Sequence, residues 1–225
     1  MAWGLWRLPE RKLGLLGEVR GKDVLELGCG AAHWSIALSR RGARVVGLDL
    51  SPKRLAQAQR EMKRAGVEFP LVEASAESVP LPDDSFDVVF SDWGAMTFAN
   101  PRRSIPEVER LLRPGGSLVF TNSSPFRSVC HDRRRDRIGK ALLYDYYDLG
   151  RIAFPDGVEY QLPVGGWIAT FRAHGLWVES LLEPRPPSRA RSTYLSADEE
   201  RWAKHWPLEV IWKVRKSESL EWQEE

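Results

Sequence analysis

Apolar and polar positions along the first half of the chain follow two alternating periods. Short apolar runs predict buried strands over residues 23–27, 44–48, 69–73, 86–90 and 117–121. Between these runs, apolar residues recur at helical spacing and predict helices over residues 34–40, 52–65 and 106–112. Short strands that alternate with amphipathic helices indicate a parallel sheet with right-handed crossovers. We therefore expect a doubly wound α/β fold.

In the second half of the chain, the alternation of strand and helix signals is interrupted and then resumes. Residues 123–156 carry few strand signals and predict a small helical cap inserted after the fifth strand. Further elements are expected in the order helix, strand, helix, strand, over residues 164–174, 177–182, 197–206 and 208–214. A single domain over residues 1–216 follows, made of a cofactor half (22–122), the cap (123–156) and a closing part (157–216). Residues 217–225 form a polar tail.

Composition narrows the function classes. The 33 basic residues nearly balance the 31 acidic ones, for a net charge of +2. This balance does not indicate a nucleic-acid-binding surface. No apolar run has the length of a membrane span, and the first residues lack the apolar core of a signal peptide. Two cysteines, Cys29 and Cys130, fit reduced thiols. We expect a soluble cytoplasmic protein with no membrane or nucleic-acid partner.

A glycine-containing loop directly follows the first predicted strand. Gly28 and Gly30 allow the backbone to turn sharply and to approach a ligand closely. Asp49 ends the second strand about 20 positions later, a separation that suits a carboxylate accepting hydrogen bonds from ribose hydroxyls. Taken singly, the glycines fit a plain tight turn and Asp49 fits a helix cap; together, at this spacing, they favour a nucleoside site.

Two residues distinguish between the nucleoside cofactors. A dinucleotide fingerprint needs a third glycine at position 33, where this chain has the bulky His33. Glu26, two residues before the first glycine, can instead face the ammonium group of a methionine moiety, and the helix N-terminus can face its carboxylate. This combination favours S-adenosylmethionine over a nicotinamide dinucleotide.

Four segments carry a resemblance to a known family. Residues 24–30 (VLELGCG), 45–51 (VVGLDLS), 80–89 (PLPDDSFDVV) and 112–116 (LRPGG) resemble those of class I S-adenosylmethionine-dependent methyltransferases, in the branch of ubiquinone and menaquinone biosynthesis. The resemblance implies a Rossmann-like, mostly parallel seven-stranded sheet with an antiparallel last strand. It also implies an enzyme that methylates a small molecule and releases S-adenosylhomocysteine.

The resemblance further implies which residues bind the cofactor. Asp49 would hold the ribose and Leu50 would lie under the adenine. The remaining candidates are assigned to the methionine end (Glu26, Gly28, Cys29, Gly30), to the adenine edge (Ser75, Ala76, Glu77) and to closure over the methionine moiety (Ser91, Asp92, Trp93). Two positions depart from the family pattern. Ala32 stands where a third glycine is common, and Ser75 stands where an aspartate usually accepts from the adenine amine.

A general base is needed only if the acceptor starts protonated and is not acidic in itself. The candidates are Asp92, His33 and His131. His33 fits equally a solvent-facing helix start, and His131 a surface position. The four histidines and two cysteines lack ligand spacing, so no metal is expected. The loop that related enzymes use on base or amide nitrogens is absent, which argues against nucleic-acid substrates.

The substrate side is the least determined part of the sequence. Ten tryptophans are present, most of them expected in the core. Candidate walls of an acceptor cavity are Trp3, Trp6, Tyr144, Tyr146 and Tyr147. The run of three arginines at 133–135 fits a solvated face or a site for an anionic substrate. A non-catalytic cofactor-binding module and an NAD-binding oxidoreductase remain alternatives, and a monomer and a homodimer are both open.

Overall fold

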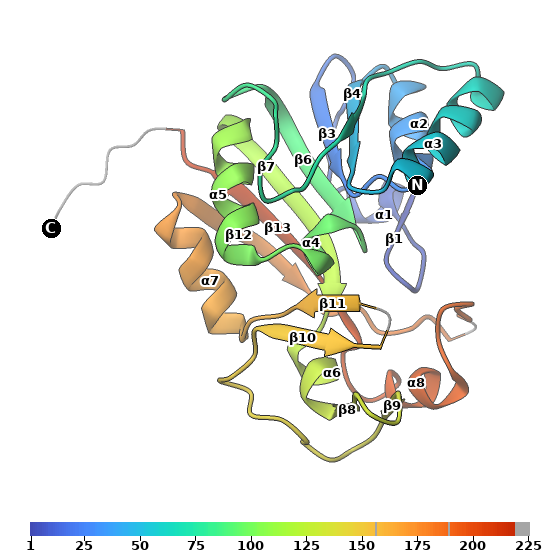
Figure 1. Ribbon diagram of the computed structural model, residues 1–225, viewed down its shortest axis with the longest axis vertical. Coiled ribbons are helices and arrows are strands. Elements are labelled where there is room, and N and C mark those ends of the chain that lie inside the picture. The colour runs from blue at the N-terminus through green and yellow to red at the C-terminus, as the bar shows by residue number, and fades with distance from the viewer. Residues whose placement is uncertain (156, 189, 219–225) are drawn as a thin grey trace, which may run out of the picture.

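A seven-stranded sheet forms the centre of the computed structural model, which describes residues 1–155, 157–188 and 190–218 (Figure 1). Its strand order is β12-β13-β7-β6-β3-β4-β5. The strands are β3 (Asp23–Leu27), β4 (Arg44–Asp49), β5 (Leu71–Glu73), β6 (Phe86–Asp92), β7 (Leu112–Ser123), β12 (Leu176–Leu182) and β13 (Glu209–Lys216). β13 lies between β7 and β12 and runs antiparallel to both, whereas β3 to β7 are mutually parallel. The expected α/β fold with a reversed last strand is confirmed.

Helices cover both faces of the sheet because successive strand residues point to opposite sides. Helices α2 (His33–Ser39) and α3 (Pro52–Ala65) pack on one face, and α5 (Pro101–Leu111) and α7 (Val164–Ala173) pack on the other (Figure 1). Val24 of β3 belongs to the apolar cluster under α2 and α3, and its neighbour Leu25 belongs to the cluster under α5 and α7. Each face therefore has its own core.

Helices α3 and α5 begin at the same local signal, a capping residue followed by proline. The Ser51 side chain accepts from the Arg54 amide at the start of α3, as expected. Helix α5 begins at Pro101, where Asn100 is the cap, and not at the expected Pro106. Because a proline has no amide hydrogen, it suits the first turn of a helix, where that hydrogen would have no partner, and Pro106 was expected there. The structure instead accommodates Pro106 inside α5.

The cap contains less helix than expected. Helix α6 (Pro125–Cys130) is followed by two short antiparallel pairs, β8 (His131–Asp132) with β9 (Arg137–Ile138) and β10 (Arg151–Phe154) with β11 (Gly157–Tyr160). Apolar residues of this region pack as single anchors into a third cluster, which also contains Trp6, Trp202 and Leu208. Apolar residues that pack singly need no regular spacing along the chain. The spacing of apolar residues therefore did not indicate the secondary structure of the cap.

The chain begins with a small hairpin that returns to the sheet. β1 (Ala2–Trp3) pairs with β2 (Leu8–Pro9), and α1 (Glu10–Leu13) follows. Gly14 ends this helix in a left-handed conformation. α8 (Ala197–Trp202) starts with a capping box, and α4 (Ala95–Phe98) is a single turn after β6. Among the described residues, no helix is long and apolar enough to cross a membrane. The predicted polar tail lies mostly outside the described residues.

Candidate functional site

The glycine loop lies at the carboxyl end of β3, where ligands bind in open α/β sheets. The amides of Gly28 and Cys29 donate to the Leu48 carbonyl at 2.8 and 2.9 Å, which holds the loop against β4. A Cβ on Gly28, whose φ is +77°, would lie 2.9 Å from Gly94 Cα and closer still to the Ala95 amide. Gly30 also has a positive φ of +54°, but a Cβ there would meet nothing within 4 Å. Gly28 serves backbone packing, and Gly30 faces open space.

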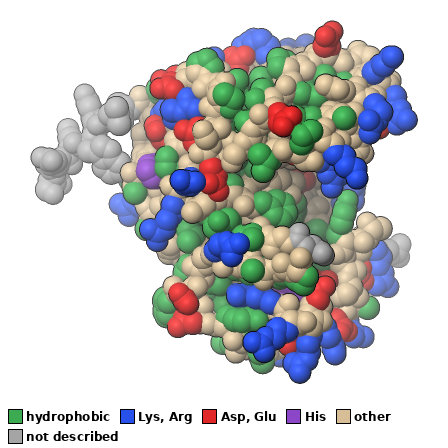
Figure 2. Space-filling model, in the orientation of Figure 1, with side chains coloured by type: hydrophobic (Ala, Val, Ile, Leu, Met, Phe, Trp, Pro, Cys, Tyr) green, Lys and Arg blue, Asp and Glu red, His purple; other side chains and the backbone are tan. Residues whose placement is uncertain are grey.

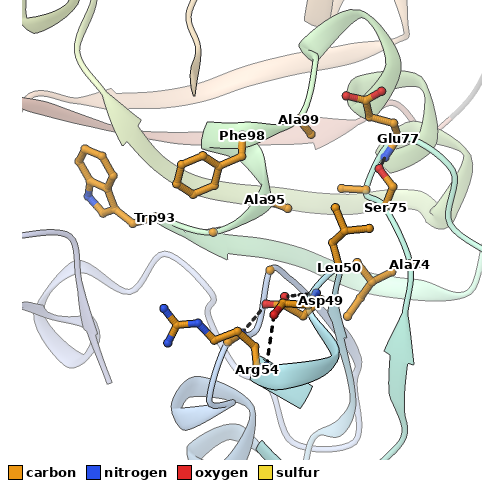
Figure 3. A pocket seen from close by; sticks show the side chains of 16 residues that line it. Asp49, Leu50, Arg54, Ala74, Ser75, Glu77, Trp93, Ala95, Phe98 and Ala99 are labelled. Carbon is orange, nitrogen blue, oxygen red and sulfur yellow. Dashed lines mark hydrogen bonds between the residues drawn. The ribbon is translucent and has the colours of Figure 1, made fainter. Parts of the chain in front are cut away.

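A cavity of about 610 Å³ opens between this loop and α4 (Figure 3). Asp49 extends into it from the end of β4; its Oδ2 accepts from the Gly30 amide at 2.8 Å and its Oδ1 from the Ser51 amide at 2.9 Å. Each carboxylate oxygen therefore keeps a lone pair for a ligand. Leu50 and Phe98, both largely exposed, line the same cavity from different elements. The volume and the mostly apolar lining suit a nucleoside.

One end of this first cavity is formed by residues 74–77. Ser75, Ala76 and Glu77 all line it, as the sequence suggested. The Ser75 hydroxyl accepts from the Glu77 amide at 3.1 Å, so its own hydrogen is left to donate. The Glu77 carboxylate accepts from the Asn100 amide at 2.7 Å and pairs with Arg103. Glu77 thus also secures the start of α5.

A second cavity of about 640 Å³ shares Gly28, Gly30, Arg54 and Trp93 with the first. Glu26, Cys29, His33 and Asp92 line its inner part. Glu26 is buried, and one of its oxygens accepts from both the amide and the hydroxyl of Ser35 in the first turn of α2. Burial raises the pKa of Glu26 to about 8. A cationic ligand group would favour its ionised form.

Asp92 and the residue after it connect this cavity to distant parts of the chain. Asp92 Oδ1 accepts from the Gly4 amide at 2.9 Å and from Thr121 Oγ1 at 2.7 Å, and Oδ2 accepts from Trp34 Nε1 at 3.1 Å. Burial raises the pKa of Asp92. Trp93, with a left-handed φ of +49°, donates its indole hydrogen to Glu209 at 2.8 Å. Burial also raises the pKa of Glu209, to about 7.

These buried glutamates predict a pH dependence of stability. The pKa values of Glu26 and Glu209, about 8 and 7, lie above their ordinary value of 4.5, so the folded chain binds protons that the unfolded chain has released. This contribution is complete below the ordinary value and is lost as pH rises through 7 and 8. We expect the free energy of unfolding of the ligand-free protein to fall by roughly 2–4 kcal/mol between pH 5 and pH 9, measured by urea denaturation. Glu26→Gln with Glu209→Gln should flatten this dependence; an unchanged slope would show that other groups cause it.

The structure separates the three candidate bases. Asp92 and His33 line the second cavity, with His33 exposed at its edge. His131 lines neither cavity and is not on the surface: it is only 3% exposed, packs against Phe154, and contacts Asp136 Oδ1 through Nε2 at 3.0 Å. The β8–β9 pair turns it inward. The catalytic and the surface assignments of His131 are therefore both corrected.

Another predicted site residue also lies outside both cavities. Ser91 is buried and lines neither cavity; its hydroxyl donates to the Leu27 carbonyl and accepts from the Met96 amide, so it fastens β6 to the glycine loop. Ala32 adopts a left-handed φ of +58°, the conformation that a glycine would take without strain. Cys29 and Cys130 are both free and buried. In the described parts of the chain, no group of histidine, cysteine and acidic side chains could hold a metal.

The aromatic residues proposed as walls of the acceptor cavity line neither cavity. Trp3 is fully buried, donates to Glu10 and packs on Trp34 and Phe90. Trp6 belongs to the cap cluster. The Tyr144 ring lies under the Arg133 guanidinium, Tyr146 accepts from the Val164 amide, and Tyr147 is 87% exposed. Aromatic content alone did not distinguish packing from ligand contact.

The outer part of the second cavity is made by residues that the sequence did not single out. They come from the N-terminal hairpin, from α6, from α8 and from the segment before α8: Leu5, Arg7, Arg127, Tyr194, Leu195 and Glu199. Figure 2 shows the surface hollowed between the sheet and the cap. Tyr194 is largely exposed, and Arg127 pairs with Glu159 and Glu199. No motif marks these residues, because tertiary packing alone brings them together.

Comparison with known proteins gives a consistent picture. Residues 25–120 match a family described as methyltransferase domain. A demethylmenaquinone methyltransferase of Thermus thermophilus is 37% identical over 122 residues, which are 53% of this chain and 54% of that protein. A fatty-acid O-methyltransferase of Mycolicibacterium smegmatis is 36% identical over 110 residues, or 48% of this chain and 39% of that one. The chain spans about half the length of the curated relatives it matches.

Solved structures extend the likeness beyond the matched segment. An S-adenosylmethionine dependent methyltransferase from Mesorhizobium loti shares 26% identity and a TM-score of 0.71 over 91% of this chain and 95% of that one. A geranyl diphosphate methyltransferase solved with geranyl diphosphate (GPP) and sinefungin has a TM-score of 0.69 at 15% identity, over 92% of this chain and 77% of that one, and shows the fold alone. Residues 25–120 thus resemble methyltransferase domains in sequence, and the expected fold is confirmed over nearly the whole chain.

Proposed function

We propose that this chain binds S-adenosylmethionine across the two cavities and transfers its methyl group to a small molecule. The observation that carries the proposal is the open space at Gly30 beside Asp49: Gly30 lines both cavities and a Cβ on it would meet no protein atom within 4 Å, while both oxygens of Asp49 keep a free lone pair. Such a cradle suits a ribose whose two hydroxyls donate to one carboxylate.

The residues present fit the rest of the cofactor. Leu50 and Phe98 would contact the two faces of the adenine, and the Ser75–Ala76 backbone its edge. Ser75 would accept from the adenine amine less strongly than an aspartate. Glu26 and Asp92, buried with raised pKa values, would face the ammonium and sulfonium groups, whose positive charge favours ionised carboxylates. Cys29 and Trp93 would form neutral walls around the methionine end of the cofactor.

When bound, S-adenosylmethionine supplies a methyl group already activated on sulfur, so the chain mainly positions the acceptor in line with it. Positioning can account for up to about 7–11 kcal/mol of barrier reduction. Hydrogen bonds from Gly4, Thr121 and Trp34 fix the Asp92 carboxylate in place, so we assign it to positioning. His33, exposed at the cavity edge, is then the remaining candidate for taking a proton from the acceptor.

The acceptor would enter through the outer part of the second cavity. Leu5, Tyr194 and Leu195 give this part apolar walls, and Arg7 adds a positive charge. Two matched relatives are by name a demethylmenaquinone methyltransferase and a fatty-acid O-methyltransferase. These observations support an acceptor with a large apolar part, of the quinone or lipid class. Cytoplasmic location and a single domain over residues 1–216 belong to the same proposal.

Calorimetry with S-adenosylmethionine, S-adenosylhomocysteine and NAD tests the cofactor. We expect both sulfur ligands to bind and NAD not to bind; tight NAD binding without a response to S-adenosylhomocysteine would refute the proposal. A methyl-transfer screen against quinones, phenols and fatty acids, read by mass, then tests activity. Cofactor binding without transfer to any acceptor class would favour the non-catalytic module.

A further inference from the structure

Glu209, the first residue of β13, is a buried carboxylate without a cationic partner among the described residues. Its side chain is 0% exposed, and its Oε2 accepts from the Leu5 amide at 2.7 Å and from Trp93 Nε1 at 2.8 Å. Its Oε1 is buried with no hydrogen-bond partner among the residues the structure describes. Burial of such a group costs stability, because its charged form loses water without gaining a cationic partner.

Both partners of Glu209 belong to the walls of the cavities. Leu5 lines the second cavity, and Trp93 lines both. Leu5 lies in the turn of the N-terminal hairpin, and Trp93 directly follows β6, so a single oxygen joins two segments that are far apart in the sequence. The three residues that follow Glu209 in β13, Val210, Ile211 and Trp212, are apolar and buried, so a hydrophobic residue would suit this end of the strand better on packing grounds alone.

The turn that carries Leu5 is fitted closely against this carboxylate. Gly4 has a φ of +68°, and a Cβ on it would lie 2.6 Å from Glu209 Cδ. The Gly4 amide donates to Asp92 on the other side. The turn is thus held between two carboxylates, one from β6 and one from β13. A side chain at position 4 would collide with the Glu209 carboxylate.

We propose that Glu209 is a positioning residue that fixes the N-terminal turn and Trp93 together, and so sets the shape of the cavity in which acceptor and cofactor meet. The inference rests on the proposed function for its catalytic meaning. Its structural content stands separately: removing the carboxylate should release both segments at once, while a neutral group that still accepts hydrogen bonds should hold them.

Hydrogen exchange of the Leu5 amide, followed by NMR in the ligand-free protein, tests the structural content. Glu209→Ala is expected to speed this exchange by at least about 10-fold, and Glu209→Gln to stay within about 3-fold of the parent chain. Glu179→Ala, which removes an exposed ion-pairing glutamate from the neighbouring β12, is the matched control and should have no effect. Unchanged Leu5 exchange in Glu209→Ala would overturn the proposal.

A double-mutant cycle tests the effect on binding, with S-adenosylhomocysteine as the probe. Gly4→Ala and Glu209→Ala are each expected to weaken its affinity by about 10-fold, and the double variant by no more than either single one, because the added methyl group no longer meets a carboxylate. Additive losses would overturn the coupling. If Glu209→Ala does not fold, Gly4→Ala alone must speed Leu5 exchange. A parent chain that fails to bind S-adenosylhomocysteine refutes the proposed function and leaves the exchange test intact.

Discussion

Replacing Asp49 with alanine is expected to weaken binding of S-adenosylmethionine by at least about 100-fold. Each hydrogen bond from a ligand hydroxyl to a carboxylate contributes roughly 1.5–3 kcal/mol, and the two ribose hydroxyls would both be lost. The loop would also lose the contact between Asp49 Oδ2 and the Gly30 amide, which orders the cradle before the ligand arrives. Calorimetric titration of the parent and the variant measures the change.

Glu73→Ala is the control for this experiment. Glu73 pairs in register with Asp49 on the neighbouring strand and is also acidic, but it is exposed and lines neither cavity. We expect its affinity to stay within about 3-fold of the parent chain, since surface substitutions change little. Equal affinity of Asp49→Ala and the parent would show that the ribose lies elsewhere.

Alanine substitutions at the two glycines of the loop should have different effects, one mainly on cofactor affinity and the other mainly on stability. In Gly30→Ala the new methyl group enters open space, so the fold should persist at a cost of about 1 kcal/mol for the left-handed backbone, while cofactor affinity falls by at least about 30-fold. In Gly28→Ala the methyl group meets the backbone of Gly94 and Ala95, which cannot move aside as a side chain could. We expect a loss of about 3–5 kcal/mol in stability.

Urea denaturation and calorimetry on both variants separate the two outcomes. Gly66→Ala provides the control for backbone strain, because Gly66 has a φ of +65° with open space around it but ends α3 away from both cavities. It should lose about as much stability as Gly30→Ala and no affinity. A Gly30→Ala protein that binds the cofactor as tightly as Gly66→Ala would contradict the cradle.

The fold was predictable because its determinants are local. Each parallel strand is an apolar run with a marked end, and Ser51 before Pro52 fixes the start of α3 within one turn. The same signal, Asn100 before Pro101, also marks the start of α5, but the prediction placed that start at Pro106, which lies closer to the apolar run. The cofactor side of the site was predictable for the same reason: Glu26, Gly30 and Asp49 follow from two adjacent strand ends.

The acceptor side could not be predicted, because its residues come together only through tertiary packing. Glu209 contacts Leu5 across 204 positions in the sequence, and no spacing rule connects them. A charged residue directly before the apolar run 210–212 of the last strand was the one available signal. Trp3 and His131 were misplaced because side-chain type indicates what a residue can do and not which way it faces.

The insertion of β13 between β7 and β12 has a consequence for the order in which a nascent chain can mature. The N-terminal turn is synthesised before its anchors Asp92 and Glu209, which follow 88 and 204 positions after the residues they bind. During synthesis the parallel strands can assemble with the contact between Gly4 and Asp92 while Glu209 is still missing and the sheet keeps an open edge at β7. The turn therefore gains its second anchor, at Leu5, only when the last strand is added.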